Sequence, residues 1–157
     1  PRGVYAVDGD VERPGWQAAF EGLPVTCIVE SRSFDAGELR ITALSRRDSF
    51  TADLSIPAAD RFHIAFGHGP DFALGNVRAD LLVAGHTHGG QVRLPGIGPL
   101  LTLCAIPREW AAGVTRLEGG RTLVVSRGIG MERGPAPRFR FLCRPEIVVI
   151  DAAPGPR

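Results

Sequence analysis

The chain has few of the features that mark membrane, secreted or nucleic-acid-binding proteins. It contains no run of about 18 apolar residues, so it predicts no transmembrane segment, and no signal peptide is visible. Its cysteines, Cys27, Cys104 and Cys143, are too widely spaced for a disulfide framework or a cysteine zinc site, and we expect each to be a small core residue. The 18 Lys and Arg residues nearly balance 17 Asp and Glu. A net charge of +1 gives no electrostatic reason to expect nucleic acid or an anionic membrane as partner.

The composition is that of a soluble globular domain. Hydrophobic residues make up 44% of the chain and charged residues 22%, and 157 residues predict one domain. We place this domain at residues 1–151, followed by a frayed tail at 152–157. The chain opens with Pro1 and enters an apolar run at once, so we expect it to continue a longer protein. We expect a cytoplasmic or membrane-peripheral location rather than secretion.

Short apolar runs bounded by turn residues predict an α/β fold. Residues 112–117 and 122–126 are typical of a hairpin, and short helices are expected at 16–21 and from Pro70 to Leu74. Charged residues 46–48 predict a solvated loop, 92–103 a loop with short extended pieces, and 128–137 a Gly/Pro loop. The remaining predicted strands are 4–7, 25–30, 38–44, 61–66, 80–84 and 146–150.

Possible ligands follow three of these strands, each directly after a glycine. Gly9 precedes Asp10, Gly67 precedes His68, and residues 85–88 read Gly-His-Thr-His. If the strands are parallel neighbours, their loops meet at one edge of the sheet. Imidazole and carboxylate ligands suit Mn, Fe or Zn, and such ions promote hydrolysis. His63 lies inside an apolar strand, and we expect it to be a core or sheet-face residue.

These motifs resemble a known family. Residues 85–91 (Gly-His-Thr-His-Gly-Gly-Gln), with Arg-Leu-Pro-Gly at 93–96, are similar to the last signature of bacterial calcineurin-like metallophosphoesterases. Gly-His-Gly-Pro-Asp at 67–71 resembles the preceding signature, and segments 126–130, 138–139 and 144–147 resemble the family's C-terminal part. The resemblance implies an α/β/β/α sandwich, seen here without its N-terminal part. It further implies a centre of two divalent ions that hydrolyses phosphate esters.

The resemblance also assigns ligands. His68 and His86 would bind one ion and His88 the other. Asp10 stands at the asparagine of the family's Gly-Asn-His-Asp/Glu signature and would join His68. Val11 replaces the histidine of that signature, which stabilises the phosphate and assists the leaving group, and valine cannot donate a proton. No catalytic residue is therefore assigned.

Three interpretations follow, because the family's earlier Asp-x-His and Gly-Asp signatures are absent. The chain is the C-terminal portion of a phosphoesterase acting on a small-molecule or lipid phosphate ester. Alternatively, it is a catalytically inactive binding or scaffold domain of phosphoesterase descent, or a domain with a single metal ion that uses only His68, His86 and His88. A half-sandwich leaves apolar faces uncovered, which predicts self-association or marginal stability.

Overall fold

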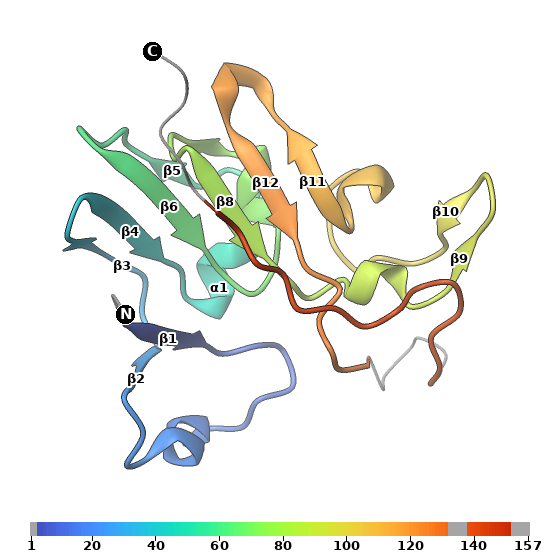
Figure 1. The fold of residues 1–157 in the computed structure, drawn as a ribbon, viewed down its shortest axis with the longest axis horizontal. Coiled ribbons are helices and arrows are strands. Elements are labelled where there is room, and N and C mark those ends of the chain that lie inside the picture. Colours follow the sequence, from blue (N-terminus) through green and yellow to red (C-terminus); the bar gives the residue numbers. More distant parts are fainter. Residues whose placement is uncertain (1–2, 132–137, 152–157) are drawn as a thin grey trace.

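A six-stranded mixed sheet forms the centre of the computed structural model, which describes residues 3–131 and 138–151 (Figure 1). Its strand order is β11-β12-β8-β6-β4-β3. The four inner strands are parallel and the two edge strands pair antiparallel with their neighbours. The bounds are β3 (Arg32–Ala36), β4 (Leu39–Ala43), β6 (Phe62–Phe66), β8 (Leu81–Ala84), β11 (Gly113–Arg116) and β12 (Thr122–Val125).

Small two-stranded sheets and short helices surround this central sheet. The pairs are β1 (Val4–Val7) with β2 (Val25–Ile28), β5 (Ser55–Ile56) with β7 (Asn76–Val77), and β9 (Arg93–Leu94) with β10 (Gly98–Pro99). The helices are α1 (Arg46–Ser49) and the 3-10 turns η1 (Trp16–Phe20), η2 (Asp71–Leu74), η3 (His88–Gly90), η4 (Arg108–Trp110) and η5 (Glu118–Gly120). The arrangement is α/β-like, as expected. Within 3–131 and 138–151, no helix has the length and apolar character needed to cross a membrane.

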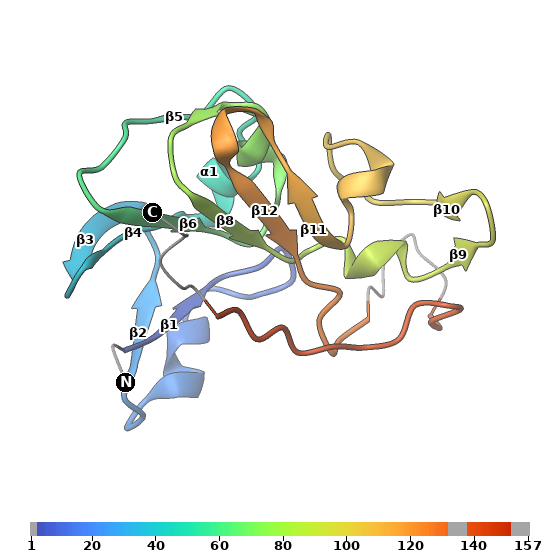
Figure 2. The same ribbon diagram turned by 45° about the horizontal axis from the view of Figure 1, so that its top comes forward.

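The hydrophobic core lies on one face of the central sheet. Side chains alternate between the two faces of a strand, so Leu82 and Ala84 of β8 meet Leu123 and Val125 of β12 on this side. Phe72 of η2 covers them and is fully buried. The same face holds the β5–β7 pair, which lies above the sheet in Figure 2.

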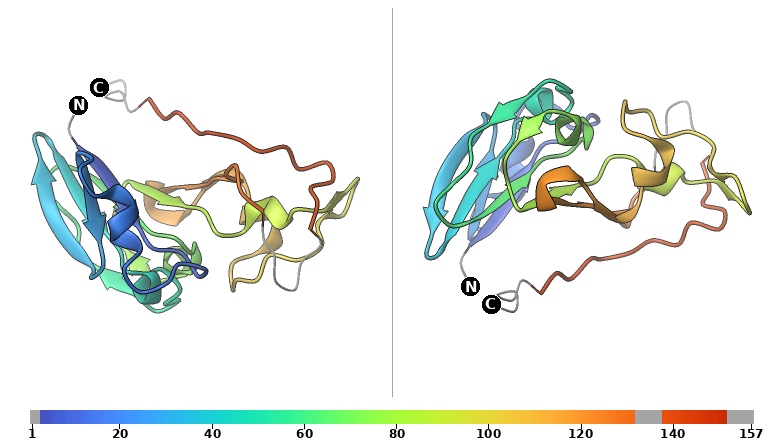
Figure 3. Two further views of the ribbon diagram at one scale, coloured as in Figure 1. Left: turned by 90° about the horizontal axis from the view of Figure 1, so that it is seen from below. Right: turned by 90° about the horizontal axis from the view of Figure 1, so that it is seen from above.

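The opposite face is covered only in part. Tyr5 of β1 packs against Phe34 and Phe66, with ring centroids 5.0 and 6.3 Å away. Farther along the sheet, residues 138–151 run back across the molecule from the β9–β10 end (Figure 3). A hollow of about 580 Å³ lies between this segment and the strands, lined by apolar side chains such as Leu81 and Val148.

The predicted strand at 146–150 is wrong. Glu146 donates its backbone N–H to Gly128 O, but residues 146–151 form no strand, and Ile147 and Val149 are each more than 80% exposed. Hydrogen bonds of a sheet run in its plane, so a segment joins a sheet only at an edge. This segment lies over the face, beside Leu81 and Val124, where no ladder can form.

The predicted charged loop at 46–48 is helical, and one strand of the central sheet, β3, was not predicted. Ser45 caps α1 by accepting the N–H of Asp48 at 3.2 Å, which is the pattern of a helix N-terminus.

The strand β3 pairs with β4 across a two-residue turn containing Gly37, whose φ of +66° favours glycine. The strand at 4–7 forms as predicted, but outside the central sheet. The tail at 152–157 and the end of the 128–137 loop lie outside the described residues.

His63 is a core residue, as predicted, with 3% of its surface exposed. Its Nε2 lies 2.7 Å from Thr42 Oγ1, and its backbone N–H donates to Asp80 Oδ2 at 2.7 Å. Burial lowers the pKa of His63 below the ordinary histidine value, because a charged imidazole is poorly solvated there.

We expect this buried histidine to weaken the fold in acid. Between its ordinary pKa of about 6.5 and its lowered folded pKa, the unfolded chain binds a proton that the folded chain does not. The stability that His63 contributes is therefore complete above this window and is lost as the pH falls through it. Urea unfolding at several pH values should show this decline, and it should be shallower in His63→Gln. An identical pH dependence in both proteins would contradict the prediction.

Candidate metal site at the strand ends

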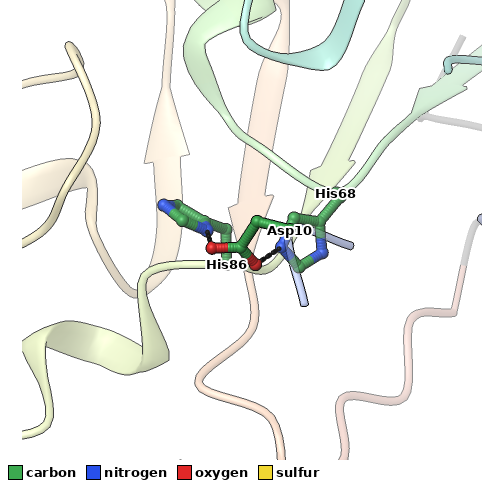
Figure 4. A group of neighbouring side chains, drawn as sticks. All are labelled: Asp10, His68 and His86. Atoms are coloured by element: carbon green, nitrogen blue, oxygen red, sulfur yellow. Dashed lines mark hydrogen bonds and ion pairs between the residues drawn. The ribbon is translucent and has the colours of Figure 1, made fainter. Parts of the chain in front are cut away.

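Asp10, His68 and His86 meet at the carboxyl ends of the strands (Figure 4). One ligand atom from each residue lies within 4.8 Å of the other two. The strands β6 and β8 are parallel neighbours, so their following loops emerge at the same edge, as predicted. Asp10 follows β1, which belongs to another sheet, yet its loop reaches the same place.

Close packing of the backbone brings the Asp10 loop to His68. A Cβ added at Gly9 would lie 2.8 Å from Cε1 of His68 and 2.6 Å from Oε2 of Glu12. Only glycine allows this approach without displacing His68. Arg46 of α1 also donates to the Gly9 carbonyl at 3.3 Å, which ties the Asp10 loop to α1.

The loop after β8 holds its histidines in an unusual backbone conformation. His86 and His88 both have positive φ, at 64° and 47°, a region that costs energy for residues other than glycine. Thr87 between them is buried, and its hydroxyl donates to Ala111 O at 2.7 Å and accepts from Gly89 N at 3.2 Å. This anchor holds the strained loop in place.

The carboxylate of Asp10 lies between two imidazoles. Its Oδ1 is 3.0 Å from His68 Nε2 and its Oδ2 is 3.6 Å from His86 Nδ1. Burial opposes ionisation of Asp10, but backbone and His68 hydrogen bonds, together with both histidines, lower its pKa overall. Burial also lowers the pKa of His68, and Asp10 offsets this effect only in part. An ionised carboxylate and neutral imidazoles are the forms that bind metals.

The tautomer of His86 provides the test of whether a cation fits. Its Nε2 lies 3.1 Å from the Leu103 carbonyl, which can only accept, so Nε2 donates, and in the neutral ring Nδ1 then carries a lone pair. That lone pair faces Oδ2 of Asp10, which is also an acceptor. Two facing acceptors require a proton or a cation between them. The donor set therefore fits a divalent metal ion.

Phe50 holds both histidine rings from the side. Its ring centroid lies 4.7 Å from that of His86 and 6.1 Å from that of His68, with interplanar angles of 88° and 60°. Edge-to-face packing of this kind fixes ring orientation. A Cβ at Gly69 would lie 2.7 Å from the Phe50 ring, so glycine leaves room for it. Phe50 was not predicted as a site residue. Ser45, a residue type that caps helices, was the signal in the sequence for the helix α1 that places Phe50.

His88 and Val11 do not join the group. The Nδ1 of His88 lies 3.3 Å from the guanidinium of Arg140, and its carbonyl accepts from Cys143 Sγ at 3.1 Å. Its predicted role as ligand to a second ion stays a prediction. Val11 is largely exposed and apolar.

Comparisons with known proteins point to metallophosphoesterases. The chain is 40% identical over 138 residues to the uncharacterized metallophosphoesterase YkuE of Bacillus subtilis, covering 87% of this chain and 46% of that protein. It is 32% identical over 90 residues to phosphodiesterase YaeI of Escherichia coli, covering 56% of this chain and 31% of that protein. An uncharacterized metallophosphoesterase of Aquifex aeolicus is 32% identical over 71 residues, covering 45% of this chain and 24% of that protein. No protein-family profile and no solved structure matches the chain.

These similarities support a relationship to metallophosphoesterases at modest identity. The chain spans less than half the length of each of the curated relatives it matches.

We expect Phe50→Ala to weaken binding of Mn²⁺ by about tenfold, because both ligand rings lose the side chain that orients them. Phe50→Tyr keeps the aromatic ring and should bind Mn²⁺ nearly as well as the unchanged protein. Isothermal titration calorimetry measures both affinities, with circular dichroism to establish that each variant is folded. Equal affinities in Phe50→Ala and the unchanged protein would show that Phe50 does not position the site.

Proposed function

We propose that this chain is the C-terminal portion of a metallophosphoesterase that hydrolyses phosphate esters through a centre of two divalent ions. The observation that carries the proposal is the pair of facing acceptors, His86 Nδ1 and Asp10 Oδ2, beside His68. Similarity to proteins named metallophosphoesterase and phosphodiesterase supports the reaction class. The proposed domain comprises residues 1–151.

In this proposal four side chains bind the ions and two further residues position them. Asp10, His68 and His86 hold the first ion, and His88 holds the second. A divalent ion at such a site neutralises charge on phosphoryl oxygens and makes water more acidic. Leu103 fixes the His86 tautomer, and Phe50 orients both rings. The substrate is a phosphate ester of a small molecule or a lipid, and the ions are Mn, Fe or Zn.

A non-catalytic binding or scaffold domain is the second candidate. The observation that favours it is Val11, which is exposed next to Asp10 and has no group that could transfer a proton. A missing proton donor costs about 10²–10⁴ in rate. The predicted single-ion domain, which uses only His68, His86 and His88, lies between the two candidates. The structure groups Asp10, and not His88, with His68 and His86.

We further propose that the partly covered sheet face is covered in the whole protein. The resemblance supplies the occupant, the other half of an α/β/β/α sandwich, contributed by a preceding part of the protein. Without it, the hollow beside Leu81 and Val148 leaves apolar surface in contact with water. Self-association or marginal stability of the 157-residue chain then follows, and sedimentation velocity measures the first.

Metal content after loading with Mn²⁺ or Zn²⁺ tests the centre. We expect close to two ions per chain, and a large fall in His86→Ala because Nδ1 of His86 is a ligand. Elemental analysis measures the ions. His63→Gln, which removes a histidine outside the site, should keep its metal. About one ion would favour the single-ion site, and none would favour the non-catalytic domain.

Replacing Val11 should increase turnover if the proposed alignment of the signature is correct. Val11→His restores a proton donor beside Asp10, and we expect hydrolysis of bis(p-nitrophenyl) phosphate to rise by about tenfold or more. Val11→Phe serves as the matched control, since it changes size without adding a donor. Metal content should stay the same in both. An unchanged rate in Val11→His would contradict the proposed role of this position.

A further inference from the structure

The end of the molecule formed by β9 and β10 exposes many apolar side chains. Ile97, at the turn between the two strands, is 63% exposed. Large apolar residues in two neighbouring segments are exposed as well. We call this group the apolar tip; it consists of Ile97, Leu100, Leu101, Phe139, Phe141 and Leu142. A monomeric protein rarely exposes apolar residues in such a cluster without a partner.

Backbone hydrogen bonds hold the three segments of the tip together. Phe141 N donates to Gln91 O at 2.8 Å, and Arg93 N donates to Phe141 O at 3.0 Å. On the other side of segment 91–93, Leu100 N donates to Val92 O at 3.3 Å. The tip is therefore an ordered surface held by backbone hydrogen bonds. Figure 1 shows β9 and β10 projecting at one end of the molecule.

Arginine is concentrated in the segments that form the tip. Residues 86–108 and 138–145 contain five arginines and no aspartate or glutamate. The five are Arg93, Arg108, Arg138, Arg140 and Arg144. Glu109 and Glu146 directly follow these segments, and Glu146 pairs with Arg127. Arg140 donates to backbone carbonyls such as Arg127 O, whereas Arg138 and Arg144 are exposed. The charge balance of the whole chain conceals this local excess.

The tip adjoins the candidate metal site. The backbone carbonyl of Leu103, three residues after Leu100, accepts the hydrogen bond from His86 Nε2. Residues 91–94, which hydrogen-bond to Phe141 and Leu100 of the tip, directly follow the histidine loop. A surface bound at the tip would therefore lie next to the site.

We propose that the apolar tip docks on an anionic lipid bilayer. Apolar side chains enter the region between headgroups and acyl chains, and the exposed Arg138 and Arg144 pair with lipid phosphates. A protein partner would need acidic side chains placed opposite each arginine, whereas an anionic bilayer supplies negative charge at every position. This inference concerns binding and does not depend on the proposed phosphoesterase activity.

Vesicle co-sedimentation of the 157-residue chain tests the proposal. We expect binding to vesicles of phosphatidylcholine with phosphatidylglycerol, and much weaker binding to phosphatidylcholine alone or in high salt. The double variant Ile97→Ser/Leu100→Ser should bind about tenfold more weakly, through loss of apolar insertion. Arg138→Gln/Arg144→Gln should bind about tenfold more weakly to the anionic vesicles only.

A matched control changes the same residue types elsewhere. Leu23 and Arg13 are exposed between β1 and β2, and Leu23→Ser/Arg13→Gln should bind vesicles like the unchanged chain. Three results would overturn the proposal: no vesicle binding, binding that both tip variants retain, or equal loss in the control. Light scattering of the same variants separates a further case. A dimer that the tip variants dissociate, without vesicle binding, would show that the tip contacts a second copy instead.

Discussion

Parallel pairing of β6 with β8 is the constraint on which the candidate site depends. The two strands are adjacent and run in the same direction, so His68 and His86 leave the sheet at one edge. A shift of one residue in this register would turn the core side chains Ala65 and Leu82 to the other face. The same register that buries the core therefore sets the distance between the two ligands.

The site is completed by residues that are distant in sequence. Asp10 comes from a separate small sheet, Phe50 from the end of α1, and the Leu103 carbonyl from a loop. Each restrains a different property: charge, ring orientation and tautomer. A carboxylate that faces an imidazole lone pair is stable only with a positive charge between them, which is the physical basis for a cation here.

The two faces of the sheet have different roles. One face buries Phe72 and its neighbours and forms a complete core. The other face is only partly covered, by Tyr5 and by the segment that crosses it. The histidine loops and the apolar tip lie beyond the strands of the central sheet, so neither is needed to form the core. Loops of this kind vary with function while the sheet that supports them is kept.

The sequence alone determined the features that depend on local pattern. Short apolar runs bounded by turn residues predicted the strands of the central sheet except β3. Glycines at strand ends predicted the ligand loops, and an apolar setting predicted buried His63. Those features depend on residues close together in the chain. Only the tertiary structure decided that the apolar run at 146–150 stays unpaired, because pairing requires a free sheet edge. It also decided that Asp10 reaches the histidines from another sheet, that His88 faces Arg140, and that Phe50 packs on both rings. These contacts join residues up to 76 positions apart, as between Asp10 and His86, and local sequence patterns carry no information about such distances.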